Sequence, residues 1–154
     1  METLIIYFSW SGNTEKLVNE VNKQFEYDIF KLERKEPYSS DYNTCAYVEA
    51  KEEWQKQHRP IVKMPEYNML AYDRILLFFP IWWYTFPMPI ATLIENLRGY
   101  KGEIILFENS YTNDPQYVKN VMDNFKDIDS KINVSQGLFN EPASKHIEFI
   151  KKLN

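Results

Sequence analysis

The sequence has 154 residues, a net charge of −4 and a sequence pI of about 5.3. A chain of this length is expected to form a single domain over residues 1–154 with a full hydrophobic core. The negative charge argues against nucleic-acid binding, and the single cysteine, Cys45, excludes an internal disulfide and a cysteine-based zinc site, which fits a reducing, cytoplasmic setting.

The first residues have the pattern of a strand, a turn and a helix. Leu4–Phe8 is a continuous apolar run, typical of a strand covered on both faces. A signal peptide is not expected, because no basic residues precede this run. Thr14–Phe25 carries apolar residues at helical spacing. The turn Ser9–Thr14 offers hydroxyls, free backbone N–H groups and the positive end of a helix dipole, which suit a phosphate or similar anion. The alternative is that this turn only caps the helix.

The next segment predicts a weaker strand, a long helix and irregular chain. Tyr27–Leu32 contains charges within a short apolar run, and Glu33–Ser40 is a polar connector. Asp41 is a plausible N-cap for a helix to about Gln57. Tyr42, Ala46, Ala50 and Trp54 follow one stripe of this helix, whereas Glu49, Lys51, Glu52, Glu53 and Lys56 are expected to form a solvated face. His58–Tyr72 is expected to be irregular.

The second half of the chain contains the strongest strand, Ile75–Phe79, which ends at Pro80. The uncharged run Ile75–Ala91 is slightly short for the ~20 residues of a membrane span and contains three prolines, so no membrane span is expected. The remaining predicted elements are a helix from Pro89 to Leu97 closed by Gly99, a strand over Ile104–Phe107, a helix opened by Asp114-Pro115, a strand over Lys131–Ser135 and a helix over Pro142–Leu153.

Five alternations of strand and helix predict an α/β fold, a doubly wound five-stranded parallel sheet with helices on both faces. Solidly apolar strands belong in the centre, so the expected strand order is 2-1-3-4-5. In that order, the ligand should lie over the carboxyl ends of the first and third strands, where Ser9–Thr14 and Pro80–Pro89 emerge.

The identity of the ligand follows from what these two loops contain. The first loop lacks the Gly-Lys pair of a nucleoside-triphosphate site, the three glycines of a dinucleotide site and a cysteine thiolate. A phosphomonoester held by hydroxyls and amides is what remains. The second loop, Pro80–Pro87, has two tryptophans, a tyrosine and a phenylalanine that can stack on a planar ring, unless they fill the core or form a dimer contact. A planar ring on a monophosphate at this position describes FMN.

Four segments of the sequence resemble the flavodoxin-like family, specifically the short-chain branch with a Pro-Ile-Trp-Trp motif. They are Leu4–Leu17, Asp41–Lys56, Arg59-Pro60 and Tyr72–Glu95. The resemblance implies that the FMN phosphate binds at Ser9, Trp10, Ser11, Gly12, Asn13 and Thr14, with Trp10 contributing mainly backbone. It places the flavin ring beside Pro80, Ile81, Trp82, Trp83 and Thr85.

Two positions depart from the family pattern. Tyr84 stands where the family usually has glycine, and it should make a backbone turn toward the flavin costlier, because residues other than glycine resist positive φ. The third loop, normally small and glycine-rich, contains Glu108, Asn109, Ser110 and Tyr111, whose side chains are expected near the pyrimidine edge of the flavin. Glu108 could instead be a solvated carboxylate.

The resulting expectation is an FMN-binding electron-transfer protein in which the flavin performs the chemistry. The alternatives are an NAD(P)H-dependent FMN quinone or flavin reductase and a flavodoxin-fold binding module that has lost FMN. Expected partners are redox proteins or small electron acceptors, with the chain a monomer or homodimer. No catalytic residue and no metal site are predicted, and His58 and His146 are expected at the surface, outside the ligand crevice.

Overall fold

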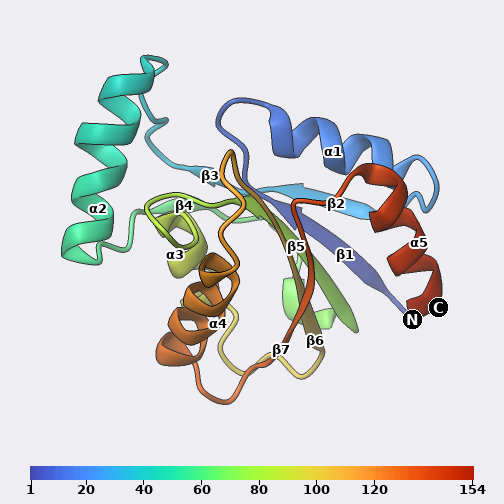
Figure 1. Ribbon diagram of the computed structural model, residues 1–154. Coiled ribbons are helices and arrows are strands. Elements are labelled where there is room, and N and C mark those ends of the chain that lie inside the picture. Colours follow the sequence, from blue (N-terminus) through green and yellow to red (C-terminus); the bar gives the residue numbers. More distant parts are fainter.

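In the computed structural model, which describes residues 1–154, a five-stranded parallel sheet runs through the centre of the protein (Figure 1). The strand order β2-β1-β5-β6-β7 confirms the predicted 2-1-3-4-5 arrangement. The strands are β1 (Thr3–Tyr7), β2 (Asp28–Lys31), β5 (Arg74–Pro80), β6 (Glu103–Asn109) and β7 (Asn133–Phe139). The second and last of them are the edge strands, as the charges and alternation in their sequences predict.

Helices cover both faces of the sheet (Figure 1). On one face lie α1 (Asn13–Asn22) and α5 (Ala143–Leu153), and on the other lie α3 (Met88–Asn96) and α4 (Gln116–Ile128). None of the helices has the combination of length and apolar sequence that crossing a bilayer requires.

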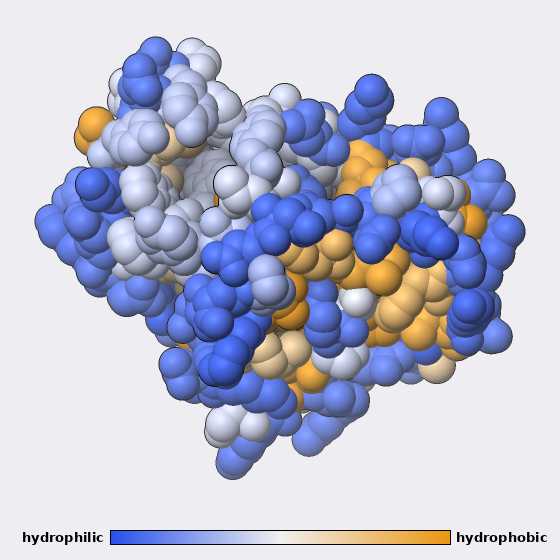
Figure 2. All heavy atoms as spheres, in the orientation of Figure 1, coloured by the Kyte–Doolittle hydropathy of each residue, from blue (hydrophilic) through white to orange (hydrophobic).

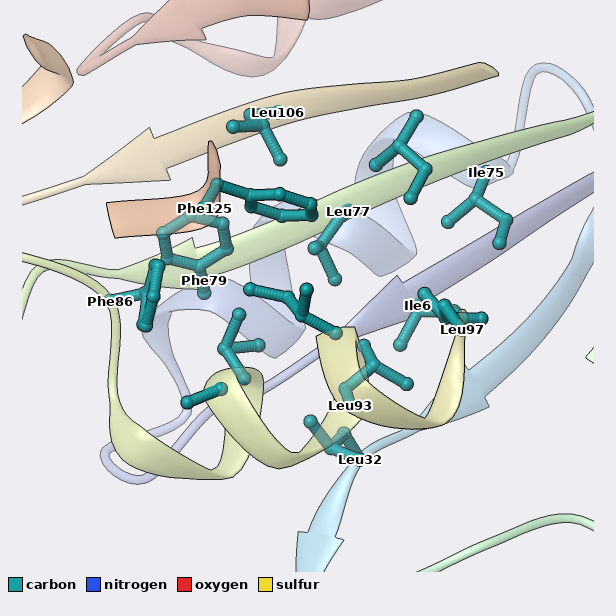
Figure 3. Close-up of a cluster of buried hydrophobic side chains, with 14 of the residues drawn as sticks. Ile6, Leu32, Ile75, Leu77, Phe79, Phe86, Leu93, Leu97, Leu106 and Phe125 are labelled. Atoms are coloured by element: carbon teal, nitrogen blue, oxygen red, sulfur yellow. The ribbon is translucent and has the colours of Figure 1, made fainter. Parts of the chain in front are cut away.

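The apolar strands supply both halves of the core, because successive residues of a strand point to opposite faces. In β5, Leu77 and Phe79 belong to the cluster under α3 and α4, whereas Leu76 and Phe78 belong to the cluster under α1 and α5. Figure 3 shows Leu93 of α3 among the strand side chains of the first cluster. Since the central strands β1, β5 and β6 are buried on both sides, their sequences are largely continuous apolar runs.

The predicted helix after Asp41 exists, but its first half is wound as a π-helix, η1 (Thr44–Ala50), which continues into α2 (Lys51–Lys56). Asp41 caps it as predicted, because Asp41 Oδ2 accepts the backbone N–H of Thr44 at 2.9 Å. This helix stands outside the layers of the doubly wound fold, at the upper left of Figure 1. It is therefore free to form a wall beside the ends of the strands.

A second, two-stranded antiparallel sheet joins β3 (Glu33–Arg34) to β4 (Val62–Lys63), and a short 3₁₀ turn, η2 (Met69–Ala71), precedes β5. Both elements lie in segments expected to be a connector and irregular chain. Two-residue strands are too short to produce a periodic pattern, so hydrophobic periodicity does not predict them.

The predicted solvated face of the η1–α2 helix is wrong for Glu49 and Glu53. Arg34 of β3 reaches across to Glu49 Oε2 at 3.2 Å and to Glu53 Oε2 at 3.0 Å, and the Tyr38 hydroxyl donates to Glu53 Oε1. Glu53 is buried in this cluster. The solvated face is confirmed at Glu52 and Lys56, which form an exposed ion pair at 2.7 Å.

His146 is also not at the surface. It is buried on α5 against the rings of Phe78 and Phe107, and its Nδ1 lies 3.0 Å from the carbonyl oxygen of Pro142. Burial lowers the pKa of this imidazole below its ordinary value. His58 is exposed, as expected.

Candidate functional site

A cavity of about 410 Å³ opens where the carboxyl ends of β1, β5 and β6 meet the η1–α2 helix. Figure 2 shows a hollowed region beside that helix, mostly in the pale colours of tyrosine, tryptophan, serine and threonine. The lining residues are Ser9, Trp10, Ser11, Asn13, Thr14, Tyr42, Cys45, Ala46, Tyr47, Ala50, Pro80, Ile81, Trp82, Trp83, Tyr84, Asn109, Ser110, Tyr111, Thr112 and Tyr117. None of them is Asp, Glu, Lys, Arg or His.

One end of the cavity is the turn that begins α1. Gly12 has a φ of 97°, a left-handed conformation that glycine adopts without strain, and its backbone N–H donates to Ser9 Oγ at 3.1 Å. Thr14 is buried and donates through Oγ1 to Asn109 Oδ1 at 2.8 Å. Trp10 also lines the cavity, and its indole Nε1–H donates to the Ser39 carbonyl at 3.0 Å. This turn thus presents hydroxyls and the first N–H groups of a helix to the cavity.

A two-residue hairpin turn forms the opposite side. Trp82 and Thr85 exchange backbone hydrogen bonds of 2.8 and 3.3 Å, and the two residues between them, Trp83 and Tyr84, have φ values of 50° and 71°. Positive φ at both central residues is the type I′ geometry, usually built from Asn-Gly. Tyr84 therefore already holds a positive φ in this turn, the conformation that was expected from the sequence to be costly for a tyrosine.

The indole of Trp83 is fixed by its neighbours. Its Nε1–H donates to the Ala46 carbonyl of η1 at 2.9 Å, and its ring stacks on Trp54 at an interplanar angle of 15°. Trp82 packs edge-on against Phe8. The aromatic side of the cavity is consequently preformed and tied to the η1–α2 helix.

The π-helical wall was missed by sequence reasoning. Its cavity residues are Tyr42, Cys45, Ala46, Tyr47 and Ala50, and the third loop and α4 add Thr112 and Tyr117. Part of the signal is present in the sequence, because Tyr42, Ala46 and Ala50 follow one stripe of the predicted helix. Burial raises the pKa of the Cys45 thiol to about 12, so this side chain behaves as a small apolar group.

The third loop closes the cavity from the side of β6. The Tyr111 ring is 90% exposed and its hydroxyl accepts a hydrogen bond from Asn13 Nδ2 at 3.3 Å, bridging this loop to the first one. Asn140 supports the loop from beneath, since its Oδ1 accepts the Ser110 N–H at 2.6 Å. The first and third loops are thereby joined across the mouth.

Three residues expected at the site do not line the cavity. Gly12 faces the outer side of its turn. Thr85 is buried with Oγ1 bonded to Asn124 Nδ2 at 2.9 Å, and Glu108 is buried with Oε1 bonded to Gln136 Nε2 at 2.7 Å. Glu108 is therefore neither a residue at the cavity wall nor a solvated carboxylate. No group of three or more His, Cys, Asp or Glu side chains is arranged to hold a metal ion.

The fold and cavity can be compared with known proteins. The flavoprotein from Lactobacillus acidophilus NCFM in complex with FMN is 23% identical, with a TM-score of 0.80 over 97% of this chain and 98% of that chain. The apo-form of the flavoprotein from the same organism is 25% identical, with a TM-score of 0.70 over 91% and 92%. A protein of Bacteroides eggerthii DSM 20697, provisionally described as a flavoprotein, is 24% identical, with a TM-score of 0.82 over 99% and 96%.

A search of curated proteins finds no significant match. The family model described as flavodoxin, in contrast, matches residues 2–152, which is nearly all of the sequence. The fold, with its strand order and helices on both faces, agrees with that match. This chain belongs to the flavodoxin family.

Proposed function

We propose that the cavity binds FMN and that the protein uses it to transfer electrons. The observation that carries this proposal is the division of one uncharged cavity into a hydroxyl and amide end at Ser9–Thr14 and an aromatic end at Trp82–Tyr84. Its volume of about 410 Å³ lies within the range of small-molecule sites. The FMN complex of the Lactobacillus acidophilus flavoprotein, which has the same fold, supports the choice of ligand.

At the phosphate end, this chain offers neutral donors in place of a lysine or arginine. The hydroxyls of Ser9 and Ser11 and the N–H groups at the start of α1 are the donors available to a phosphate dianion, whereas the Thr14 hydroxyl is already donated to Asn109. Hydrogen bonds from neutral donors to a charged oxygen are stronger than those between neutral groups. We infer that this end holds the phosphate and takes no part in its chemistry.

At the ring end, the chain supplies shape and a low-polarity wall. Ile81, Trp82 and Tyr84 present apolar and aromatic surface, and Trp83 is held in place by Ala46. The bound flavin would supply the electron-transfer chemistry. No cation lines the wall and the chain carries a net charge of −4, so added negative charge on the ring is poorly stabilised and we expect a low reduction potential. Lys51 Nζ lies 5.4 Å from the centre of the Trp83 ring but is not a lining residue.

The proposal is tested by titrating the purified protein with FMN. We expect FMN fluorescence to be quenched and the melting temperature to rise with ligand excess. The double variant Ser9→Ala/Ser11→Ala should bind FMN about tenfold or more weakly, because it loses donors to a charged group. The matched control is Ser135→Ala, an exposed serine on β7 outside the cavity, which should bind as the wild type does.

Riboflavin separates the two ends of the site. It lacks the phosphate, so the Ser9→Ala/Ser11→Ala variant and the wild type should bind it equally. Absence of both quenching and stabilisation at excess FMN would reject the proposal and favour a binding module that has lost the cofactor.

A second candidate function is an NAD(P)H-dependent quinone or flavin reductase. The observation that favours it is the mouth of the cavity, where four exposed tyrosines line the opening and no lining residue is charged. The four tyrosines are Tyr42, Tyr47, Tyr84 and Tyr111. Charged rims steer protein partners, whereas an uncharged aromatic rim suits a small planar molecule.

Anaerobic reduction of the FMN-loaded protein distinguishes the two functions. A one-electron carrier should accumulate a long-lived one-electron-reduced flavin during stepwise chemical reduction. A reductase should be bleached directly by NADPH or NADH. Redox proteins are the partners expected of the carrier, and small electron acceptors those of the reductase.

A further inference from the structure

Glu108 is an acid with no charged partner, buried beside the cavity. It precedes Asn109, a cavity residue, and is 2% exposed. Its Oε1 accepts a hydrogen bond from Gln136 Nε2 at 2.7 Å. Two buried atoms of this pair have no partner at all: Glu108 Oε2 and Gln136 Oε1.

The two partnerless atoms complement each other only if the acid carries a proton. An ionised carboxylate has acceptors alone, so Oε2 and the amide oxygen would be two acceptors without a donor. A neutral carboxyl has one O–H group, which can donate to Gln136 Oε1 while Gln136 Nε2 donates to Oε1 of the acid. The pair then has two hydrogen bonds and no unsatisfied buried atom.

The residues that face Glu108 provide no counter-charge. Phe79 of β5 and Phe139 of β7 are its partners in register, and Val121 and Phe125 of α4 cover this face of the sheet. The ionisable residue of α4 nearest the cavity end of β6 and β7 is Tyr117, whose ring packs on Phe139. The charged residues of α3 and α4 lie on the outer surfaces: Glu95, which pairs with Arg59, and Lys119, Asp123, Lys126 and Asp127. Burial accordingly raises the pKa of Glu108 to about 7.

The backbone of Glu108 connects this pair to the third loop. Its carbonyl accepts the Asn140 N–H at 2.9 Å, and Asn140 has a φ of 55°, a left-handed conformation. The Asn140 side chain accepts from Ser110 N–H and donates to the Thr112 carbonyl at 3.3 Å. The Glu108 backbone is therefore connected through Asn140 to Ser110 and Thr112, which line the cavity.

We propose that Glu108 is a positioning residue, held as the neutral acid in a doubly hydrogen-bonded pair with Gln136, and that its ionisation loosens the third loop and weakens cofactor binding. The effect on cofactor binding rests on the proposed FMN site. The neutral pair and its link to the loop do not, and both can be measured without FMN.

The first experiment follows the ¹³C signal of the Glu108 carboxyl in the protein without FMN, between about pH 4 and about pH 9. The variant Glu108→Gln assigns the signal by removing it. We expect the signal to titrate well above ordinary glutamates, together with the amide signals of Ser110 and Asn140. Titration with the other glutamates, or amide signals that do not follow it, would overturn the inference.

The second experiment measures the FMN dissociation constant across the same range. Because the FMN phosphate also titrates, the useful quantity is the ratio of the wild-type constant to that of Glu108→Gln, in which this effect cancels. The ratio should be flat below about pH 6 and rise about tenfold by pH 8. Glu141→Gln removes an exposed carboxylate next to Asn140 and should retain the wild-type pH dependence.

The outcomes separate this inference from the proposed function. A flat ratio at all pH values shows that Glu108 only stabilises the β6–β7 end and overturns the coupling. If FMN does not bind at any pH but the carboxyl and amide signals titrate as expected, the proposed FMN site is rejected. The neutral Glu108–Gln136 pair and its link to the third loop are then still supported.

Discussion

Trp83 and Tyr84 place bulky side chains on a backbone that usually requires glycine. An L-residue in the left-handed region costs about 1–2 kcal/mol, and here two occur in succession. Two hydrogen bonds offset this cost: Trp83 Nε1–H donates to the Ala46 carbonyl, and Asn120 Nδ2 of α4 donates to the Tyr84 carbonyl at 3.0 Å. Strain of this kind persists at functional sites because the surroundings determine the conformation.

The strain at Tyr84 can be measured by comparing two truncations. Tyr84→Gly and Tyr84→Ala remove the same exposed ring, but only glycine relieves the positive φ. The glycine variant should therefore have a free energy of unfolding about 1 kcal/mol higher than the alanine variant. Urea denaturation measures the difference. Equal stabilities would mean that the turn relaxes to a different conformation once the ring is removed.

The residues of the site differ in how well the sequence could place them. Ser9–Thr14 and Pro80–Tyr84 were predictable, because each directly follows a strand whose carboxyl end faces the switch point. Glu108 was not, since β6 is apolar on both faces and its alternation does not reveal which side the last residues take. The position of the Glu108 side chain depends on its hydrogen bond with Gln136, which is distant in sequence.

At the scale of elements, the η1–α2 helix forms one wall of the cavity but stands outside the layers of the sheet and its covering helices. Arg34 links it to β3 through Glu49 and Glu53, and the guanidinium also lies 3.7 Å from the centre of the Tyr38 ring. Trp83 provides a second link through the Ala46 carbonyl. The sequence predicted a helix here, but the π winding and the Arg34 contacts depend on tertiary partners.

Removing the Arg34 guanidinium should release this helix. Arg34→Met leaves the buried Glu53 carboxylate unpaired, which we expect to lower the free energy of unfolding by about 3 kcal/mol and to weaken FMN binding. The double variant Arg34→Met/Glu53→Gln should recover much of the stability, because the unpaired charge is gone. Denaturant unfolding and FMN titration give the two readouts.

The control for this change is the exposed pair on the same helix. Lys56→Met removes the partner of Glu52 and should change stability by less than about 0.5 kcal/mol. If Arg34→Met is equally mild, the Arg34 cluster does not hold the helix in place.

At the scale of the whole molecule, two buried groups on opposite faces of the sheet give the stability opposite dependences on pH. Glu108 has a raised pKa, about 7 against an ordinary 4.5, so the folded state binds a proton that the unfolded state releases. Its contribution is full below about pH 4.5 and is lost as the pH rises through about 7. His146 has a pKa lowered from 6.5, so its contribution is full above that value and is lost as the pH falls.

Between about pH 4.5 and 6.5 the two effects oppose each other, so the wild type should show a shallow pH profile. Glu108→Gln should give a free energy of unfolding that rises with pH across this range, because the His146 term remains. His146→Leu should give a free energy of unfolding that falls by about 3 kcal/mol between pH 4.5 and 7, because only the raised pKa of Glu108 then acts. Urea unfolding at a series of pH values measures all three profiles. Parallel profiles would show that neither group changes its proton occupancy on folding and that the pH dependence arises at the surface.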